Sequence, residues 1–355
     1  MDVNVPDARL MPATLAPPAA FSGRGRRFAW TLLLLAVAFG AVPAAIVGTG
    51  SSYLAQIAIT TMIFVILSAS LNHVTGTAGL LSIGHAAFYG IGAYAAALLS
   101  TKLGLPFVVT LPAAGLIAAL FGFLVALPTM RLVSIYFAVA TLAIGQMLYL
   151  VMLNWVEFTK GPNGIIITKG LELFGFSLSG RLATYYTVAT VVALCVLAIG
   201  RLSHSYYGNA LRSIREDDQC ADAMGVSTAR LKMEAFTLSA FFAGVAGSLW
   251  AHMTGYISPG DFKFSESILI LAMVVVGGLG SLPGAVIGAL LLILLPEGLR
   301  AFGDFRNIMV GLVMFLSILL LPKGLLGEVS ALQLARRQLG AAWRNTVKGE
   351  GIGWR

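Results

Sequence analysis

The sequence predicts an all-α, polytopic integral membrane protein with about ten transmembrane helices and both termini in the cytoplasm. Of the 355 residues, 58% are hydrophobic and only 11% are charged, and the mean hydropathy is +0.89. Soluble globular proteins carry about 25% charged residues, so the composition excludes the usual soluble classes. Several apolar stretches reach the roughly 18 residues that a helix needs to cross a bilayer. The 40 glycines fit this class, because small residues let membrane helices approach closely.

Apolar runs in chain order define the predicted spans, which cover residues 28–48, 53–72, 80–99, 107–128, 135–155, 182–200, 236–256, 266–281, 284–299 and 307–321. The alternative for the first is a signal peptide, because AVPAA at 41–45 resembles a small-residue cleavage site. The apolar run continues and more spans follow, which favours an uncleaved span. Within 266–299, Gly and Pro residues interrupt one long apolar run. Two spans and one span plus a re-entrant segment both stay open there.

The distribution of positive charge predicts the orientation. Sixteen of the 23 Lys and Arg fall in segments that this arrangement places in the cytoplasm, as the positive-inside rule requires. The same rule explains the formal charge of +8 without nucleic acid as a partner. The chain then divides into a disordered tail (1–27), a transmembrane domain (28–321) with a cytoplasmic loop at 201–235, and a cytoplasmic tail (322–355).

The outward-facing loop at 156–180 contains the turn-rich sequence TKGPNG at 159–164. Its default interpretation is an ordinary turn, and its alternative is a docking surface for an external partner.

Motifs for catalysis and nucleotide binding are absent from the sequence. There is no G-x-x-x-x-G-K-[ST] phosphate loop, no H-E-x-x-H and no serine-elbow motif. The two cysteines, Cys195 and Cys220, match no metal or disulfide spacing. No soluble piece exceeds about 35 residues, too few for a catalytic domain. We therefore expect no catalytic residues, no metal site and no bound cofactor, and any energy for transport must come from a partner.

Two glycine-rich segments interrupt the apolar pattern. The first, 76–94, also carries Ser82 and His85, and the second is 277–288. Glycine and serine at this density permit either tight helix packing or a broken helix that lines a translocation path. Paired interruptions in the two halves of a chain are typical of internally repeated transporters. His85 is either a hydrogen-bonded structural residue or, since buried ionisable groups are costly, a functional one.

The loop at 201–235 is the only long charged passage between two strongly apolar regions, with five basic and five acidic residues. Ser213 has capping-box spacing to Glu216, and Asp217 is an alternative N-cap for a shorter helix. Gly225 follows as the helix stop. The sequence thus predicts a helix of about 8–11 residues that either docks on a partner or is a solvated connector.

Several motifs in order along the chain resemble one family, the M-type permease subunits of the Liv branched-chain amino acid ABC importers. The matching stretches are G-x-A-G-x-L-S-x-G-H-A-A-F at 76–88, G-P-N-G at 161–164, I-R-E-D at 214–217, A-M-G-V at 223–226, A-F-x-L-S-A-x-x-A-G-x-A-G at 235–247, G-G-L-G-S-x-x-G at 277–284 and P-K-G-L-L-G at 322–327. Two positions depart from the family pattern. Leu80 stands where Gln is common, which argues against a polar role there, and Lys160 stands where Gly is common.

The resemblance implies that residues 213–226 form a coupling helix that docks on a cytoplasmic ATPase subunit, with Ala221, Ala223 and Met224 as its packing face. The implied ATPase-coupling residues are Arg212, Ile214, Arg215, Glu216, Asp217, Ala221, Ala223, Met224 and Gly225. For the translocation path we expect Asn72, Ser82, His85, Tyr89, Gln146, Gly277 and Gly278. The implied partners are a second homologous permease subunit, two cytoplasmic ATP-binding subunits, a periplasmic or extracellular substrate-binding protein and membrane lipid.

The resulting hypothesis is a multi-pass permease of the cell (inner) membrane that imports branched-chain or other hydrophobic amino acids, with ATP used only by its partners. Related permeases carry urea or short amides, which is the first alternative. A secondary transporter or channel that works without ATPase subunits is the second, and an integral membrane enzyme is the third. The span interiors contain few of the paired charges that proton- or sodium-coupled transport uses.

Overall fold

The computed structural model describes residues 52–130, 134–167 and 180–300, the pairs 172–173 and 176–177, residues 43 and 132, and scattered residues between 308 and 326. Its longer helices are α2 (Ser52–Asn72), α3 (His85–Lys102), α4 (Phe107–Thr129), α5 (Ser134–Asn154), α7 (Arg181–His204), α10 (Thr228–Thr254), α11 (Phe264–Gly277) and α12 (Leu282–Gly298). The predicted first and last spans, 28–48 and 307–321, and the two terminal tails lie outside the described residues, apart from isolated positions.

The all-α prediction is confirmed, and each predicted span between 53 and 299 corresponds to one helix. Among the described residues, five helices are long and apolar enough to cross a membrane, including α4, α5 and α7. The region 266–299 contains two helices, α11 and α12, because the backbone turns at Gly278 (φ 116°) and Gly280 (φ 79°). The 14 residues of α11 reach about 21 Å, which is less than the roughly 30 Å of a hydrocarbon core.

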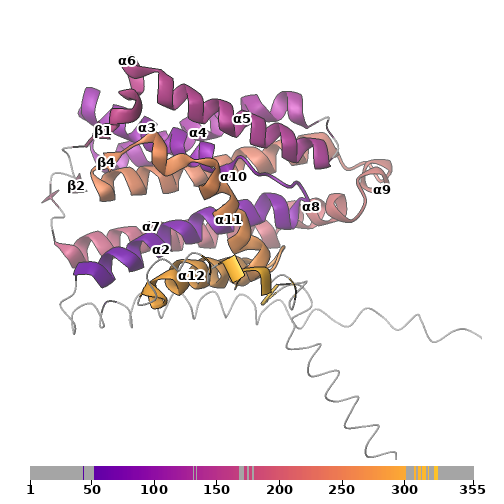
Figure 1. Cartoon of the computed structure of the whole chain (residues 1–355). Coiled ribbons are helices and arrows are strands. Elements are labelled where there is room, and N and C mark those ends of the chain that lie inside the picture. The colour runs from indigo at the N-terminus through magenta and orange to yellow at the C-terminus, as the bar shows by residue number, and fades with distance from the viewer. Residues whose placement is uncertain are drawn as a thin grey trace, which may run out of the picture.

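Helices α2 and α10 form the centre of the bundle (Figure 1). In each of these two helices, 72% of the residues in its most apolar 18-residue stretch are buried. The corresponding share is 28% in α4, 22% in α5 and 39% in α7. Helix α10 packs on α2, α3 and α4. The apolar side chains exposed on α4 and α5 therefore form the outer faces of the bundle, which suit contact with lipid.

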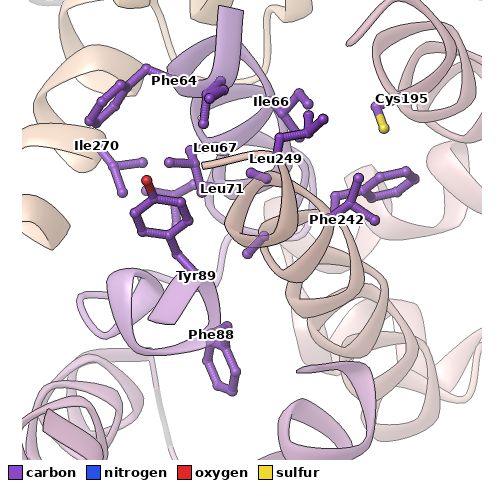
Figure 2. Packing of buried hydrophobic residues seen from close by; sticks show 14 of the residues in the cluster. Phe64, Ile66, Leu67, Leu71, Phe88, Tyr89, Cys195, Phe242, Leu249 and Ile270 are labelled. Atoms are coloured by element: carbon purple, nitrogen blue, oxygen red, sulfur yellow. The ribbon is translucent and has the colours of Figure 1, made fainter. Parts of the chain in front are cut away.

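Large apolar side chains from α2, α3, α7, α10 and α11 meet in one core (Figure 2). Where α3 crosses α10, small residues replace them. A Cβ atom added to Gly92 would lie 2.3 Å from the Cα of Gly244, so the two backbones are in direct contact. Such close crossings are how membrane helices gain packing energy without a hydrophobic driving force between them.

The short elements gather at the two ends of the helices (Figure 1). Helices α8 (Tyr206–Glu216) and α9 (Asp218–Ala223) lie at one end, and α6 (Val156–Thr159) lies at the other together with strands β1 (Ile165–Ile166) and β4 (Tyr256–Ile257). The segments that the charge distribution assigns to opposite sides of the membrane thus lie at opposite ends of the bundle.

The segment TKGPNG at 159–164 forms a compact turn, its default interpretation. Strand β1 pairs antiparallel with β4, with Ile165 opposite Ile257. A 3₁₀ turn, η3 (Gly161–Asn163), precedes β1, and the hydroxyl of Tyr256 donates to the carbonyl of Asn163 at 3.3 Å. Strands β2 (Glu172–Leu173) and β3 (Phe176–Ser177) pair antiparallel, and the 3₁₀ turn η4 (Pro259–Phe262) leads into α11.

Candidate functional site

The charged segment folds as two helices joined at a single residue, Asp217. Its backbone is extended (φ −155°), which ends α8, and its carboxylate accepts a hydrogen bond from the backbone N–H of Cys220 at 2.9 Å, which caps α9. Of the two predicted caps, Asp217 is correct. Ser213 lies inside α8, where its hydroxyl donates to the carbonyl of Ala210. The predicted length of about 8–11 residues is wrong for the capped helix, because α9 has six residues.

The predicted stop at Gly225 is confirmed. Gly225 has φ +84°, a left-handed conformation that favours glycine. The N–H of Val226 bonds to the carbonyl of Ala221 at 3.1 Å, and the N–H of Gly225 bonds to the carbonyl of Asp222 at 2.9 Å. This pair of bonds is a Schellman motif, which satisfies the last carbonyls of α9.

Hydrogen bonding at the start of α9 also sets the acidity of two side chains. The backbone N–H of Cys220 stabilises the ionised carboxylate, which lowers the pKa of Asp217. In return the carboxylate accepts from the thiol and repels the thiolate, which raises the pKa of Cys220. Both side chains are exposed on the surface of the segment.

The predicted coupling residues divide into two sets. Ile214 and Ala221 are buried inside the chain, in a small cluster with Ala78, Leu211 and Ala235. Of the three residues expected to pack on a partner, Ala221 therefore contacts this chain instead. The exposed members are Glu216, Asp217, Ala223, Met224 and Gly225, and Met224 has 84% of its surface exposed.

The two predicted coupling arginines reach back to the bundle. Arg215 donates a hydrogen bond to the backbone carbonyl of Gly76, and its side chain packs against Gly79. Arg212 donates to the carbonyl of Ser203 at 3.0 Å, at the end of α7, and to the amide oxygen of Asn209. The segment α8–α9 is thus joined to the helices by charge-assisted hydrogen bonds.

Arg215 contacts the first glycine-rich interruption, where α2 passes into a π-helical turn, η2 (His73–Thr77). The side-chain oxygen of Asn72 accepts from the backbone N–H of Gly280 at 2.9 Å. A Cβ atom on Gly76 would lie 2.2 Å from that oxygen and 2.3 Å from the nitrogen of Gly280. The two interruptions that the sequence predicts, more than 200 residues apart, therefore touch each other.

The second interruption, 277–288, contains the turn between α11 and α12, and residues 324–326 contact this turn. Gly277 packs on the backbone of Gly284, and Gly278 ends α11. The N–H groups of Leu325 and Leu326 bond to the carbonyls of Val276 and Gly277, each at 2.9 Å. The start of the predicted cytoplasmic tail thus returns to the bundle and supplies donors for carbonyls that α11 leaves unpaired.

The other predicted path residues do not form one cluster. His85 begins α3, where its Nε2 lies 2.9 Å from the hydroxyl of Ser70, which favours the structural interpretation. Tyr89 is buried with its ring against Phe262 (Figure 2 shows Tyr89 facing α2). Ser82 is buried, and Gln146 is exposed on α5. Leu80 is buried in the core, in agreement with its apolar character.

A cavity that the sequence did not predict lies between the ends of α2 and α7, helix α8 and the start of α12. Seven polar residues contribute to its wall: Asn72, His73, Thr77, Ser203, His204, Arg212 and Ser281. The signal available in the sequence was His73, an ionisable residue directly after an apolar run. No group of His, Cys, Asp and Glu in the described part of the chain could hold a metal ion.

Comparisons with known proteins give consistent matches. The profile of the family described as "Branched-chain amino acid transport system / permease component" matches residues 53–321. The branched-chain amino acid permease protein LivM of Salmonella typhimurium is 39% identical over 84% of this chain and 74% of its own length. LivM of Escherichia coli is 40% identical over 76% and 69%. LivH of Salmonella typhimurium is 28% identical over 75% and 91%. No solved structure gives a significant match.

Proposed function

Because the chain belongs to the family of branched-chain amino acid transport permease components, we propose that it forms part of the membrane pathway of an ATP-driven importer of branched-chain amino acids. The observation that carries this proposal is the match to LivM proteins over most of the chain. It is a multi-pass membrane protein, and we place it in the inner membrane. The chain supplies a route and has no chemistry of its own.

The proposed partners follow from the relatives and from the two ends of the bundle. LivM and LivH are both named as permease proteins of a high-affinity branched-chain amino acid system, which supports a second homologous permease beside this chain. The sequence lacks a phosphate-binding loop, so two ATP-binding subunits would supply the energy. A substrate-binding protein would dock at the opposite end, near η3 and β4.

The exposed residues at the end of α9, Ala223 and the following Met224 foremost, are the proposed contact with an ATPase subunit. ATP-driven closure of the ATPases would move α9 and, through Arg215, the carbonyl of Gly76. Because Gly76 and Asn72 contact Gly280, both interruptions would shift together. Rigid-body movement of the attached helices would then alternate access to the path.

Reconstitution tests the proposal directly. The chain, its predicted permease partner and the ATPase subunits are placed in proteoliposomes, and uptake of labelled leucine, isoleucine and valine is measured with the binding protein outside. We expect uptake that requires ATP and all components. Uptake of urea or acetamide in place of leucine would reassign the cargo within the same architecture. Uptake without ATPase subunits would favour a secondary transporter and refute the ABC assignment.

A further inference from the structure

The cavity between α2, α7, α8 and α12 has the character of an anion site. Arg212 contributes a permanent positive charge to its wall, and the hydroxyls of Ser203 and Ser281 add polar groups. None of the described residues that line it is acidic. An anion in the cavity would therefore be near a positive charge and hydroxyl hydrogen-bond donors.

The start of α12 adds to this field. Leu282 and Pro283, the first residues of this 17-residue helix, line the cavity, and Ser281 is its N-cap. The N-terminus of a helix carries about half a unit of positive charge from the aligned peptide dipoles, and anions bind there repeatedly in proteins.

His73 gives the independent sign that a ligand is missing. It lies in the wall of the cavity and is only 1% exposed. Its Nδ1 lies 3.3 Å from the hydroxyl of Ser203, whereas its Nε2 has no hydrogen-bond partner in the described part of the chain. Buried polar atoms are nearly always satisfied, so an unpaired ring nitrogen on a residue that lines a polar cavity indicates a place for a bound group.

We propose that this cavity binds an oxyanion group, held by the charge of Arg212, the start of α12 and the unpaired nitrogen of His73. Two sources share this chemistry: the carboxylate of an amino acid and the phosphate of an anionic lipid. If the carboxylate of an amino acid is the ligand, the cavity is a substrate-binding site at the cytoplasmic end of the path, next to α8 and α9. The first source rests on the proposed function, whereas binding of an anion by the chain itself is measurable without transport.

A binding experiment on the full chain distinguishes the sources. The chain is placed in nanodiscs of phosphatidylcholine alone, and binding is measured by calorimetry for 4-methylpentanoate, which is leucine without its ammonium group, and for leucinamide, which lacks the carboxylate. A second set of nanodiscs contains phosphatidylglycerol. We expect binding of 4-methylpentanoate and none of leucinamide. If phosphatidylglycerol instead occupies the site and abolishes that binding, the oxyanion is a lipid phosphate.

Variants tie the binding to this cavity. R212Q removes the charge, and H73F removes both ring nitrogens while preserving the ring that stacks on Tyr207. Each should weaken binding about tenfold or more, the effect expected for losing a hydrogen bond to a charged group. R212K should recover part of it, and R230Q, a change on the exposed surface of α10, should have no effect. Equal binding by leucinamide, unchanged binding by R212Q and H73F, or binding of no anion would overturn the proposal.

Discussion

Arg215 is one of the two α8 arginines that join the segment α8–α9 to the transmembrane helices. Its guanidinium donates to the carbonyl of Gly76, a residue 139 positions away in the chain. A hydrogen bond from a charged group contributes about 1.5–3 kcal/mol. This one bond is therefore large enough to influence how the movement of α9 is passed on.

We predict that R215A lowers ATP-dependent uptake about tenfold or more while ATP hydrolysis continues, because the bond to Gly76 carries the movement. Uptake per ATP hydrolysed is the measurement. R215K should restore part of it. The matched control is R230A, since Arg230 makes an exposed ion pair with Glu234 on α10, and such pairs contribute little. A ratio of uptake to hydrolysis unchanged in R215A would contradict this role.

Lys160 has a strained, left-handed backbone conformation. It is the only residue other than glycine with positive φ (+63°) in the described part of the chain. The left-handed conformation costs a residue with a side chain about 1–2 kcal/mol. Glycine at this position would remove the cost. Its greater conformational freedom in the unfolded chain would offset part of that gain.

K160G should therefore stabilise the folded chain by up to about 1 kcal/mol, visible as a higher melting temperature in detergent. The control is K263G, because Lys263 is also exposed but has φ −66° and gains nothing from glycine. If K160G and K263G shift the melting temperature equally, backbone strain at residue 160 is not the reason.

At the scale of the element, α9 is defined by its two ends. Asp217 caps its start and Gly225 its end, and both interactions are local, so the sequence contained the signals for them. The competing signal at Ser213 was misleading because the capping-box spacing also occurs inside a helix, where the hydroxyl bonds to the preceding turn.

A substitution at Gly225 tests backbone strain without steric crowding, because a Cβ atom there would meet nothing within 4 Å. G225V should fray α9 at a cost of about 1–2 kcal/mol, seen as faster hydrogen exchange of its amides and weaker co-purification of the ATPase subunit. G225N should lose much less, since Asn tolerates the left-handed conformation. Normal exchange and normal uptake in G225V would show that this turn is not needed for coupling.

Cys220 reports both the side of the membrane and the state of the α9 cap. It is exposed, whereas Cys195 is buried. A membrane-impermeant maleimide should label Cys220 in inside-out vesicles and not in right-side-out ones. A raised pKa leaves less thiolate at a given pH, so labelling should be slow near neutral pH and accelerate as pH rises.

D217N removes the charge that raises the pKa of Cys220 but keeps a capping side chain, so labelling should become faster at neutral pH. Labelling from the outer side would reverse the predicted orientation. An unchanged rate in D217N would show that the Asp217 carboxylate does not control the thiol.

For the whole molecule, the sequence predicted which segments are helices but not how they contact one another. Apolar runs and glycine interruptions gave the helix positions, including the breaks near residues 76 and 278. The contact of Asn72 with Gly280 joins residues 208 positions apart, which no local pattern reveals. Gln146 was expected to line the path, and it lies on an exposed part of α5. Its helix is apolar all round, so periodicity could not show that this face is exposed.

The return of residues 324–326 to α11 has a consequence for biosynthesis. A chain is made from its N-terminus, and the carbonyls of Val276 and Gly277 are synthesised well before the N–H groups of Leu325 and Leu326 that bond to them. Until those residues emerge, the two carbonyls need other partners. The carbonyls at the end of α11 therefore acquire their native partners only after residues 325 and 326 have been synthesised, although the break between α11 and α12 can contact Asn72 and Gly76 before then.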